Sequence, residues 1–124
     1  MIRDCTGILL GLALALVLGA CQGRNPQPSP AQIAARAAAM TPADAKLADL
    51  YVHACKSCHA APGTGAPQAG DRETWAPRAR KGMAALMKSV VTGYKGMPSG
   101  GQCFSCTTDD YRALIHFMAD QPVS

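Results

Sequence analysis

Hydrophobic and polar positions divide the chain into regions of different character. An uninterrupted apolar run covers residues 7–20, close to the N-terminus. A stretch rich in proline and alanine follows, without a repeating apolar face, and extends to residue 40. From residue 41 onward, apolar residues recur at spacings of three and four, between segments rich in glycine and proline. This alternation is typical of amphipathic helices joined by loops.

The first helical segment leads into a cluster of cysteine and histidine residues. We expect it to begin with Thr41 as the N-cap and Pro42 at the first helical position, where a missing amide hydrogen costs little. Asp44 then falls in the first turn. The apolar face comprises Leu47, Leu50, Tyr51 and Ala54. Residues 55–59 therefore lie on the last turns of this helix.

Two further helices are predicted in the same region. Residues 82–93 have one apolar face and are bounded by glycines. Residues 107–120 have another, with Thr107 or Thr108 as the N-cap. The apolar face of this last helix comprises Tyr111, Leu114, Ile115 and Met118. Residues 73–82 are expected to contain a short helical turn. Because no alternating run indicates a strand, the predicted fold class is all-α, with about three main helices and long loops.

The apolar run near the N-terminus is shorter than the ~20 residues that a membrane-spanning helix needs. Residues 1–20 are therefore predicted to be a signal peptide. The Leu-Gly-Ala-Cys sequence that ends at Cys21 resembles the bacterial lipoprotein box, in which the cysteine becomes a lipidated N-terminus. An ordinary signal peptide and an uncleaved anchor are the alternatives. Residues 21–40 are interpreted as a Pro/Ala-rich tether, and residues 41–124 as the domain.

The composition narrows the class of partner. The formal net charge is +4. Basic residues are frequent in one part of the domain, namely Arg72, Arg78, Arg80, Lys81, Lys88 and Lys95. No nucleic-acid motif accompanies them, and export argues against such a partner. They are suited to steering an acidic protein partner, or they form a solvated face that aids solubility.

The segment Cys55-Lys56-Ser57-Cys58-His59 carries the most specific chemistry. A structural zinc site would need a second pair of ligands, which Cys103 and Cys106 could supply. A thioredoxin-type dithiol would need a βαβ surrounding, which is absent. In the third interpretation, both thiols form thioethers with one haem, and the histidine that follows is its proximal iron ligand. His59 favours this third interpretation, and a haem would also enlarge the core of a small domain with few aromatic residues.

The remaining histidines are expected to be surface residues, while one methionine is a candidate for the sixth iron position. His53 and His116 lie on polar parts of their helices. The other methionines of the chain after the signal are Met40, Met83, Met87 and Met118, which precede the domain or lie on apolar helical faces. Met97 instead lies in a Gly-Met-Pro turn. A soft thioether there would favour ferrous iron, with an open site or a second histidine as alternatives.

Cys103 and Cys106 form a second C-x-x-C pair, but Thr107 follows it in place of histidine. A second haem is therefore not expected. A disulfide suits an oxidising compartment, and a redox-active dithiol remains the alternative.

Taken together, these residues resemble the cytochrome c5 group of small class I monohaem c-type cytochromes, over about residues 44–120. The C-x-x-C-H motif alone indicates only covalent haem. The more specific features are Gly65-Ala66-Pro67, Gly70-Asp71, Trp75-Ala76-Pro77-Arg78, Gly82-Met83, Met97-Pro98 and the late C-x-x-C pair.

The resemblance implies a class I cytochrome c fold, in which the first and last helices cross and wrap one haem c. It implies His59 and Met97 as axial ligands and a disulfide between Cys103 and Cys106. It also implies three supporting roles. The Pro67 carbonyl would accept a hydrogen bond from the proximal histidine, and Trp75 and Arg78 would lie near a haem propionate.

One position departs from the family pattern. Leu47 stands where the family usually has a glycine that lets the helices approach closely. A departure from the family is therefore expected in the detailed helix crossing and not in the haem site.

The resulting prediction is a monomeric one-electron carrier rather than an enzyme. It would be tethered by lipid on Cys21 at the periplasmic side of a bacterial envelope and would serve acidic redox partners. Gln22 is not an inner-membrane retention aspartate, which favours the outer membrane by resemblance to lipoprotein sorting. The alternatives are a haem subunit or sensor with an open sixth iron position, and a haem-free zinc or thiol module.

Replacing Cys21 tests the lipid tether. Cys21→Ser should abolish lipid labelling and shift the protein out of the membrane fraction, because no other acylation site is predicted. Labelled palmitate incorporation and membrane fractionation measure this. Equal membrane association of both proteins would contradict the prediction.

Overall fold

The computed structural model describes residues 27–124, so the predicted signal peptide and Cys21 lie outside the described residues. The described part is helical, and its only β feature is an isolated bridge between Tyr94 and Met97. The elements are α1 (Pro30–Ala39), α2 (Ala45–Leu50), η1 (Tyr51–Cys55), α3 (Lys56–His59), α4 (Arg72–Ala79), α5 (Met83–Thr92), η2 (Ser99–Gln102) and α6 (Thr108–Ala119). The all-α prediction is confirmed.

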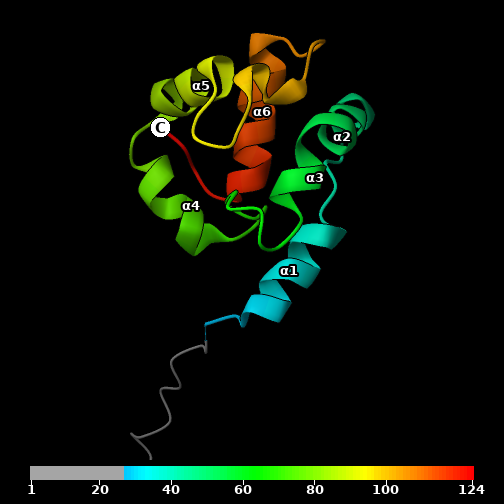
Figure 1. Cartoon of the computed structure of the whole chain (residues 1–124), viewed down its shortest axis with the longest axis vertical. Helices are drawn as coiled ribbons and strands as arrows, with labels where there is room; N and C mark the ends of the chain where they lie inside the picture. The colour runs from blue at the N-terminus through cyan, green and yellow to red at the C-terminus, as the bar shows by residue number, and fades with distance from the viewer. Residues whose placement is uncertain (1–26) are drawn as a thin grey trace, which may run out of the picture.

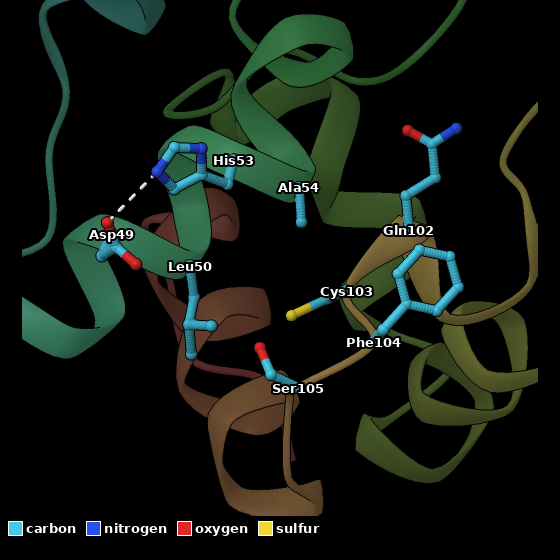
Figure 2. A pocket seen from close by; sticks show the side chains of 8 residues that line it. All are labelled: Asp49, Leu50, His53, Ala54, Gln102, Cys103, Phe104 and Ser105. Atoms are coloured by element: carbon cyan, nitrogen blue, oxygen red, sulfur yellow. Dashed lines mark ion pairs between the residues drawn. The ribbon is translucent and has the colours of Figure 1, made fainter.

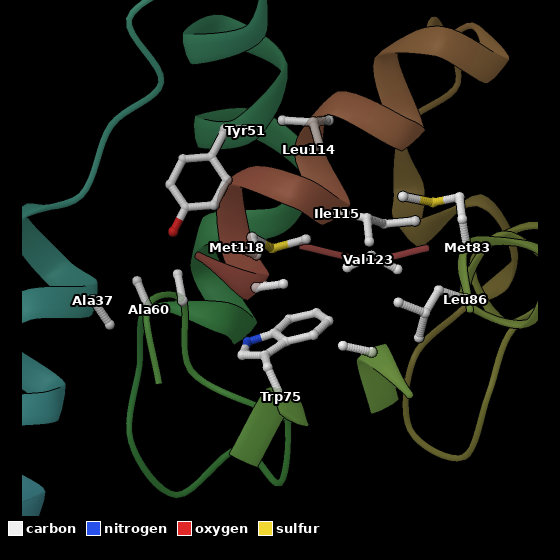
Figure 3. Packing of buried hydrophobic residues seen from close by; sticks show 13 residues of the cluster. Ala37, Tyr51, Ala60, Trp75, Met83, Leu86, Leu114, Ile115, Met118 and Val123 are labelled. Atoms are coloured by element: carbon white, nitrogen blue, oxygen red, sulfur yellow. The ribbon is translucent and has the colours of Figure 1, made fainter. Parts of the chain in front are cut away.

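The final helix, α6, occupies the middle of the domain (Figure 1). In this view α4 and α5 lie on one side of it, and α2 and α3 on the other. Its inward face supplies Leu114 and Ile115, each only 2% exposed. Figure 3 shows these side chains in one cluster with Tyr51 of η1 and Trp75 of α4. Burying this face is what holds the short helices together, because apolar burial is the main stabilising term in folding.

Residues 45–59 form one continuous helical segment that changes its hydrogen-bond pattern midway. The turn Tyr51–Cys55 is a π-helix, between the α-helical α2 and α3. Such turns are rare in proteins, and those that occur are often found at functional sites. Here the π turn ends at Cys55, so it sets the direction in which the C-x-x-C-H motif leaves α2.

The start of α2 differs from the prediction. Asp44 is the N-cap, and its carboxylate accepts a hydrogen bond from the Leu47 amide at 2.9 Å. Thr41 and Pro42 precede the helix. Aspartate is a better N-cap than threonine, which explains the later start. The predicted ends of α5 and the predicted start of α6 are confirmed, since Gly82 and Gly93 flank α5 and Thr107 caps α6.

The segment that was interpreted as a tether contains a helix, α1, and this helix packs against the domain. Ser29 caps α1, and Ala37 is fully buried in the core cluster. Arg36 pairs with Asp120 at the end of α6, and Arg72 donates to the same carboxylate at 2.8 Å. The division of the chain at residue 41 stays a prediction, but the structure adds a packed helix before it.

Polar and aromatic contacts hold the helical segment of α2 and η1 against α6, the two helices that were predicted to cross. Lys46 of α2 donates to both oxygens of Asp110 in α6, at 2.7 and 2.9 Å. The rings of Tyr51 and Phe117 meet edge to face, with centroids 4.9 Å apart. Leu47 is partly buried and packs against the core cluster. The leucine at the family's glycine position is thus accommodated at the edge of the core.

Within the described part of the chain, no helix has the length and apolar character needed to cross a membrane.

The Asp110 network makes an acid-stability prediction. The Lys46 ammonium, followed by the Thr107 amide and hydroxyl, lowers the pKa of Asp110 from 3.8 to about 2. A lowered folded-state pKa means that the network stabilises the fold above pH 3.8 and stops doing so as the pH falls towards 2.

Asp110→Asn should therefore lower the thermal midpoint at neutral pH, and the difference from wild type should shrink as the pH falls towards 2. Calorimetry across that range measures it. Asp109→Asn, on the exposed side of the same first turn, is the matched control. A difference that stays constant with pH would rule out this role for Asp110.

Candidate functional site

The C-x-x-C-H motif ends the helical segment that begins at Ala45. Cys55 is the last residue of the π turn, while Cys58 and His59 belong to α3. Cys55 is half-buried, Cys58 is exposed, and neither is in a disulfide. One side of the motif thus presents two free thiols about one helical turn apart, as attachment to a single haem requires.

His59 is held in a fixed orientation. Its side chain is buried, and Nδ1 donates a hydrogen bond to the Pro67 carbonyl at 2.8 Å. The His59 carbonyl in turn accepts from the Ala69 amide at 2.7 Å, so the following loop wraps around the residue. No partner within residues 27–124 bonds Nε2. This nitrogen is therefore available as a ligand, with its tautomer set by the Pro67 bond.

Burial lowers the pKa of His59, and the positive charge of Arg78 lowers it further, while the bond to Pro67 acts in the opposite direction. A lowered pKa keeps the imidazole neutral. A neutral imidazole is the form that binds a metal.

Trp75 and Arg78, which the family resemblance placed near a haem propionate, both lie close to His59. The Trp75 ring is stacked beside the imidazole, with centroids 6.0 Å apart, and Nε1 donates to the Gln68 carbonyl at 2.9 Å. Arg78 donates to the Thr74 carbonyl within α4.

The helix α4, which carries both residues, is longer than the short turn predicted there. It is capped by Asp71, whose carboxylate accepts a hydrogen bond from the Thr74 amide.

The thiols do not resemble a redox or zinc centre. Burial and the neighbouring Cys58 raise the pKa of Cys55 to about 11, whereas reactive thiols have lowered pKa values. Among residues 27–124, no group of three or more Cys, His, Asp or Glu is arranged to hold a metal ion. Cys103 and Cys106, the proposed second zinc pair, are bonded to each other. These three observations favour the haem interpretation.

Met97 lies in the loop between α5 and η2, where it is partly buried. Its amide and carbonyl exchange hydrogen bonds with those of Tyr94, each at 3.0 Å. Gly93, which begins the loop, has φ of +83°, and a Cβ there would lie 3.1 Å from the Met97 carbonyl oxygen. Glycine therefore permits the tight turn that presents this methionine.

The surface beside Cys55 is hollowed (Figure 2). An open groove of about 420 Å³ is lined by Asp49, Leu50, His53, Ala54 and residues 102–105. His53 pairs there with Asp49 at 3.2 Å, and both side chains are exposed. His116 is exposed as well. The prediction that these two histidines lie at the surface is confirmed.

Sequence reasoning overlooked the hydroxyl group of Tyr111. The residue was assigned to the apolar face of the last helix, but its hydroxyl lies 3.0 Å from the Gly100 oxygen and 2.9 Å from the Cys103 oxygen. Helical periodicity cannot reveal a partner in a loop of irregular shape. The one available signal was the residue type, since the hydroxyl of a partly buried tyrosine usually has a hydrogen-bond partner.

Comparison with known proteins gives a consistent result. Residues 42–118 match the family described as cytochrome C oxidase, cbb3-type, subunit III. The chain is 32% identical to cytochrome c5 of Azotobacter vinelandii over 73 residues, which cover 57% of this chain and 88% of that protein. It is 40% identical to cytochrome c-555 of Chlorobaculum thiosulfatiphilum over 75 residues, 57% of this chain and 87% of the relative. It is 35% identical to cytochrome c-555 of Chlorobaculum tepidum over 75 residues, which cover 57% of this chain and 69% of that protein.

The disulfide between Cys103 and Cys106 is formed in the structure, with Cα atoms 5.4 Å apart. Replacing both residues by serine should lower the thermal midpoint, by the equivalent of ~2 kcal/mol on the entropic model for a short loop. Haem should stay attached, because the attachment motif lies elsewhere, while the Met97 loop should become more mobile. Thermal unfolding and hydrogen exchange of the loop measure these effects. Two titratable thiols in native, non-reduced protein would contradict the bond.

Proposed function

Because the chain belongs to the class I monohaem c-type cytochromes, we propose that it is a membrane-tethered carrier of single electrons. The family carries one covalent haem c, attached in this chain through the C-x-x-C-H motif. The observation that carries the proposal is the motif's geometry: two free thiols followed by a buried imidazole, oriented by the Pro67 carbonyl.

The residues present fit this group well. Cys55 and Cys58 provide the two attachment points, and His59 has Nε2 free among the described residues. Bound haem supplies a couple between ferric and ferrous iron. The protein's contribution is to hold the axial ligands rigidly, to keep the imidazole neutral and to leave part of the site accessible to partners. No acid, base or nucleophile is needed for that task, so we propose no catalytic residues.

Met97 is proposed as the sixth ligand, because its surroundings differ from those of the other methionines. Met83 and Met118 are buried in the core cluster, and Met40 and Met87 pack against it. Met97 is the one methionine among residues 27–124 that takes no part in this packing. Its thioether is therefore free to bind iron, and a soft sulfur ligand favours the ferrous state and raises the reduction potential.

We further propose that Pro67 acts by polarising the proximal imidazole, and that Trp75 and Arg78 bind a propionate. The hydrogen bond from His59 to Pro67, the ring stacking of Trp75 and the proximity of Arg78 support these roles. A carbonyl acceptor strengthens an imidazole as a ligand, and a guanidinium suits a carboxylate.

Lipid on Cys21 would hold the protein on the periplasmic side of a membrane, with the outer membrane favoured. The exposed basic residues on α4, α5 and the segments that follow them support docking with acidic redox proteins; they are Arg72, Arg80, Lys81, Lys88 and Lys95. Such charges raise the rate of encounter more than the affinity, which suits a carrier that must leave after each transfer. The proposed state is a monomer.

Replacing Met97 tests both the haem and the ligand. Wild-type protein made with haem-maturation machinery should give the pyridine haemochrome spectrum of haem c, and a colourless protein would contradict the function. Met97→Ala should keep the haem but lose the near-infrared band of methionine-bound ferric iron. Its reduction potential should fall, and carbon monoxide should bind.

The matched control is Met83→Ala, which removes a buried core methionine. It should cost on the order of 2–5 kcal/mol of stability through a cavity and leave the band intact. A band that survives Met97→Ala would refute the ligand assignment. Carbon monoxide binding by the wild-type protein would instead favour a haem sensor or subunit with an open sixth position.

A further inference from the structure

The loop that presents Met97 has an irregular backbone. Five residues of the loop adopt positive φ angles, namely Gly93, Lys95, Gly100, Gly101 and Gln102. Such a backbone cannot continue the hydrogen-bond ladder of a helix, so its polar groups need other partners. Whatever supplies these partners decides how firmly Met97 is held.

Most of the bonds found in the loop are internal or reach back to α5. The Gly101 amide donates to the Pro98 carbonyl at 2.9 Å, and the Ser99 hydroxyl donates to the Val91 carbonyl at 2.6 Å. The Cys103 amide donates to the Gly100 carbonyl at 2.9 Å. These bonds shape the loop, but none of them joins it to α6, the helix in the middle of the domain.

Tyr111 makes that connection. It lies in the first turns of α6, and its hydroxyl is within 3.0 Å of the Gly100 oxygen and 2.9 Å of the Cys103 oxygen. A Cβ at Gly100 would lie 3.2 Å from this hydroxyl, so the loop approaches the ring closely. Among the described residues, Tyr111 is the side chain of α6 that hydrogen-bonds this loop.

The two carbonyls lie at structurally important points. Gly100 is three residues from Met97, and Cys103 begins the disulfide. The disulfide closes the end of the loop, while the phenol fixes that closed end to the helix. Without the phenol, the loop would keep its shape but lose its hydrogen-bonded attachment to α6.

We propose that Tyr111 is a positioning residue that holds the Met97 loop against α6 and thereby keeps the sixth iron ligand in place. This inference rests on the proposed ligation by Met97. A thioether binds ferric iron more weakly than ferrous iron, so the ferric protein depends more on such support. Releasing the loop should therefore expose ferric iron to added ligands more often.

Tyr111→Phe is the direct test, because it removes the hydroxyl and keeps the ring. The probe is cyanide, which binds ferric haem when the methionine leaves. We expect the association rate to rise about tenfold, since one hydrogen bond is worth a factor of that order. Hydrogen exchange at the Gly101 and Cys103 amides should accelerate as well, with no change at amides in α4.

The matched control is Tyr94→Phe. Tyr94 lies in the same loop, but its side chain is half exposed and its hydroxyl has no hydrogen-bond partner among residues 27–124. This variant should bind cyanide at the wild-type rate. Both variants are compared well below their thermal midpoints, so that global unfolding does not contribute.

The outcomes separate this inference from the proposed function. If Met97→Ala loses the band but Tyr111→Phe binds cyanide at the wild-type rate, Met97 remains the ligand and the role of Tyr111 is refuted. Faster loop exchange with unchanged cyanide binding would also refute it, since the phenol would then hold the loop without positioning a ligand. If the band survives Met97→Ala, the ligand assignment fails and the inference falls with it.

Discussion

The hydrogen bond from His59 to the Pro67 carbonyl is the contact on which the site depends. It spans eight residues and fixes one buried ring against a loop that has no regular structure of its own. Once Nδ1 is engaged, Nε2 is the ring nitrogen left for the proposed bond to iron. The same loop is pinned again through the Trp75 indole, which donates to the Gln68 carbonyl. Two neighbouring carbonyls thus orient the ligand and the ring that stacks on it.

The loop that presents Met97, the proposed sixth ligand, has a different construction. Met97 comes from an irregular loop that begins at α5 and ends at the disulfide, and Tyr111 ties this last part of the loop to α6. The histidine is set by one short-range loop, whereas the methionine is set by several weak contacts between distant segments.

Local signals allowed much of this to be predicted. The glycines at 82 and 93, the Thr107 cap and the C-x-x-C-H motif act within a few residues, and the structure has the helix ends where they indicated. The disulfide pairing followed from the family resemblance and is present. The start of α2 was missed because Thr41 and Asp44 can both cap a helix and stand three residues apart, and the structure uses Asp44.

Other features depend on partners far along the chain, which periodicity does not reveal. The sequence of α1 shows almost no apolar face, but in the structure Arg36 forms an ion pair with Asp120, and Ala37 is buried. The hydroxyl bonds of Tyr111 likewise depend on the path of a separate loop. The haem ligation itself, with Met97 opposite His59, stays a prediction that spectroscopy can decide.

The docked α1 helix limits how far a lipid-anchored domain could search for partners. Its ten residues would span up to about 35 Å if extended, but only about 15 Å as a helix. Because the helix is also fixed to the end of α6, it cannot act as a free joint. For a protein held at Cys21, as proposed, only the short segment before α1 would provide reach. The domain would then stay within a thin layer above the lipid surface, where its effective concentration towards membrane-bound partners is high and its exchange with distant ones is slow.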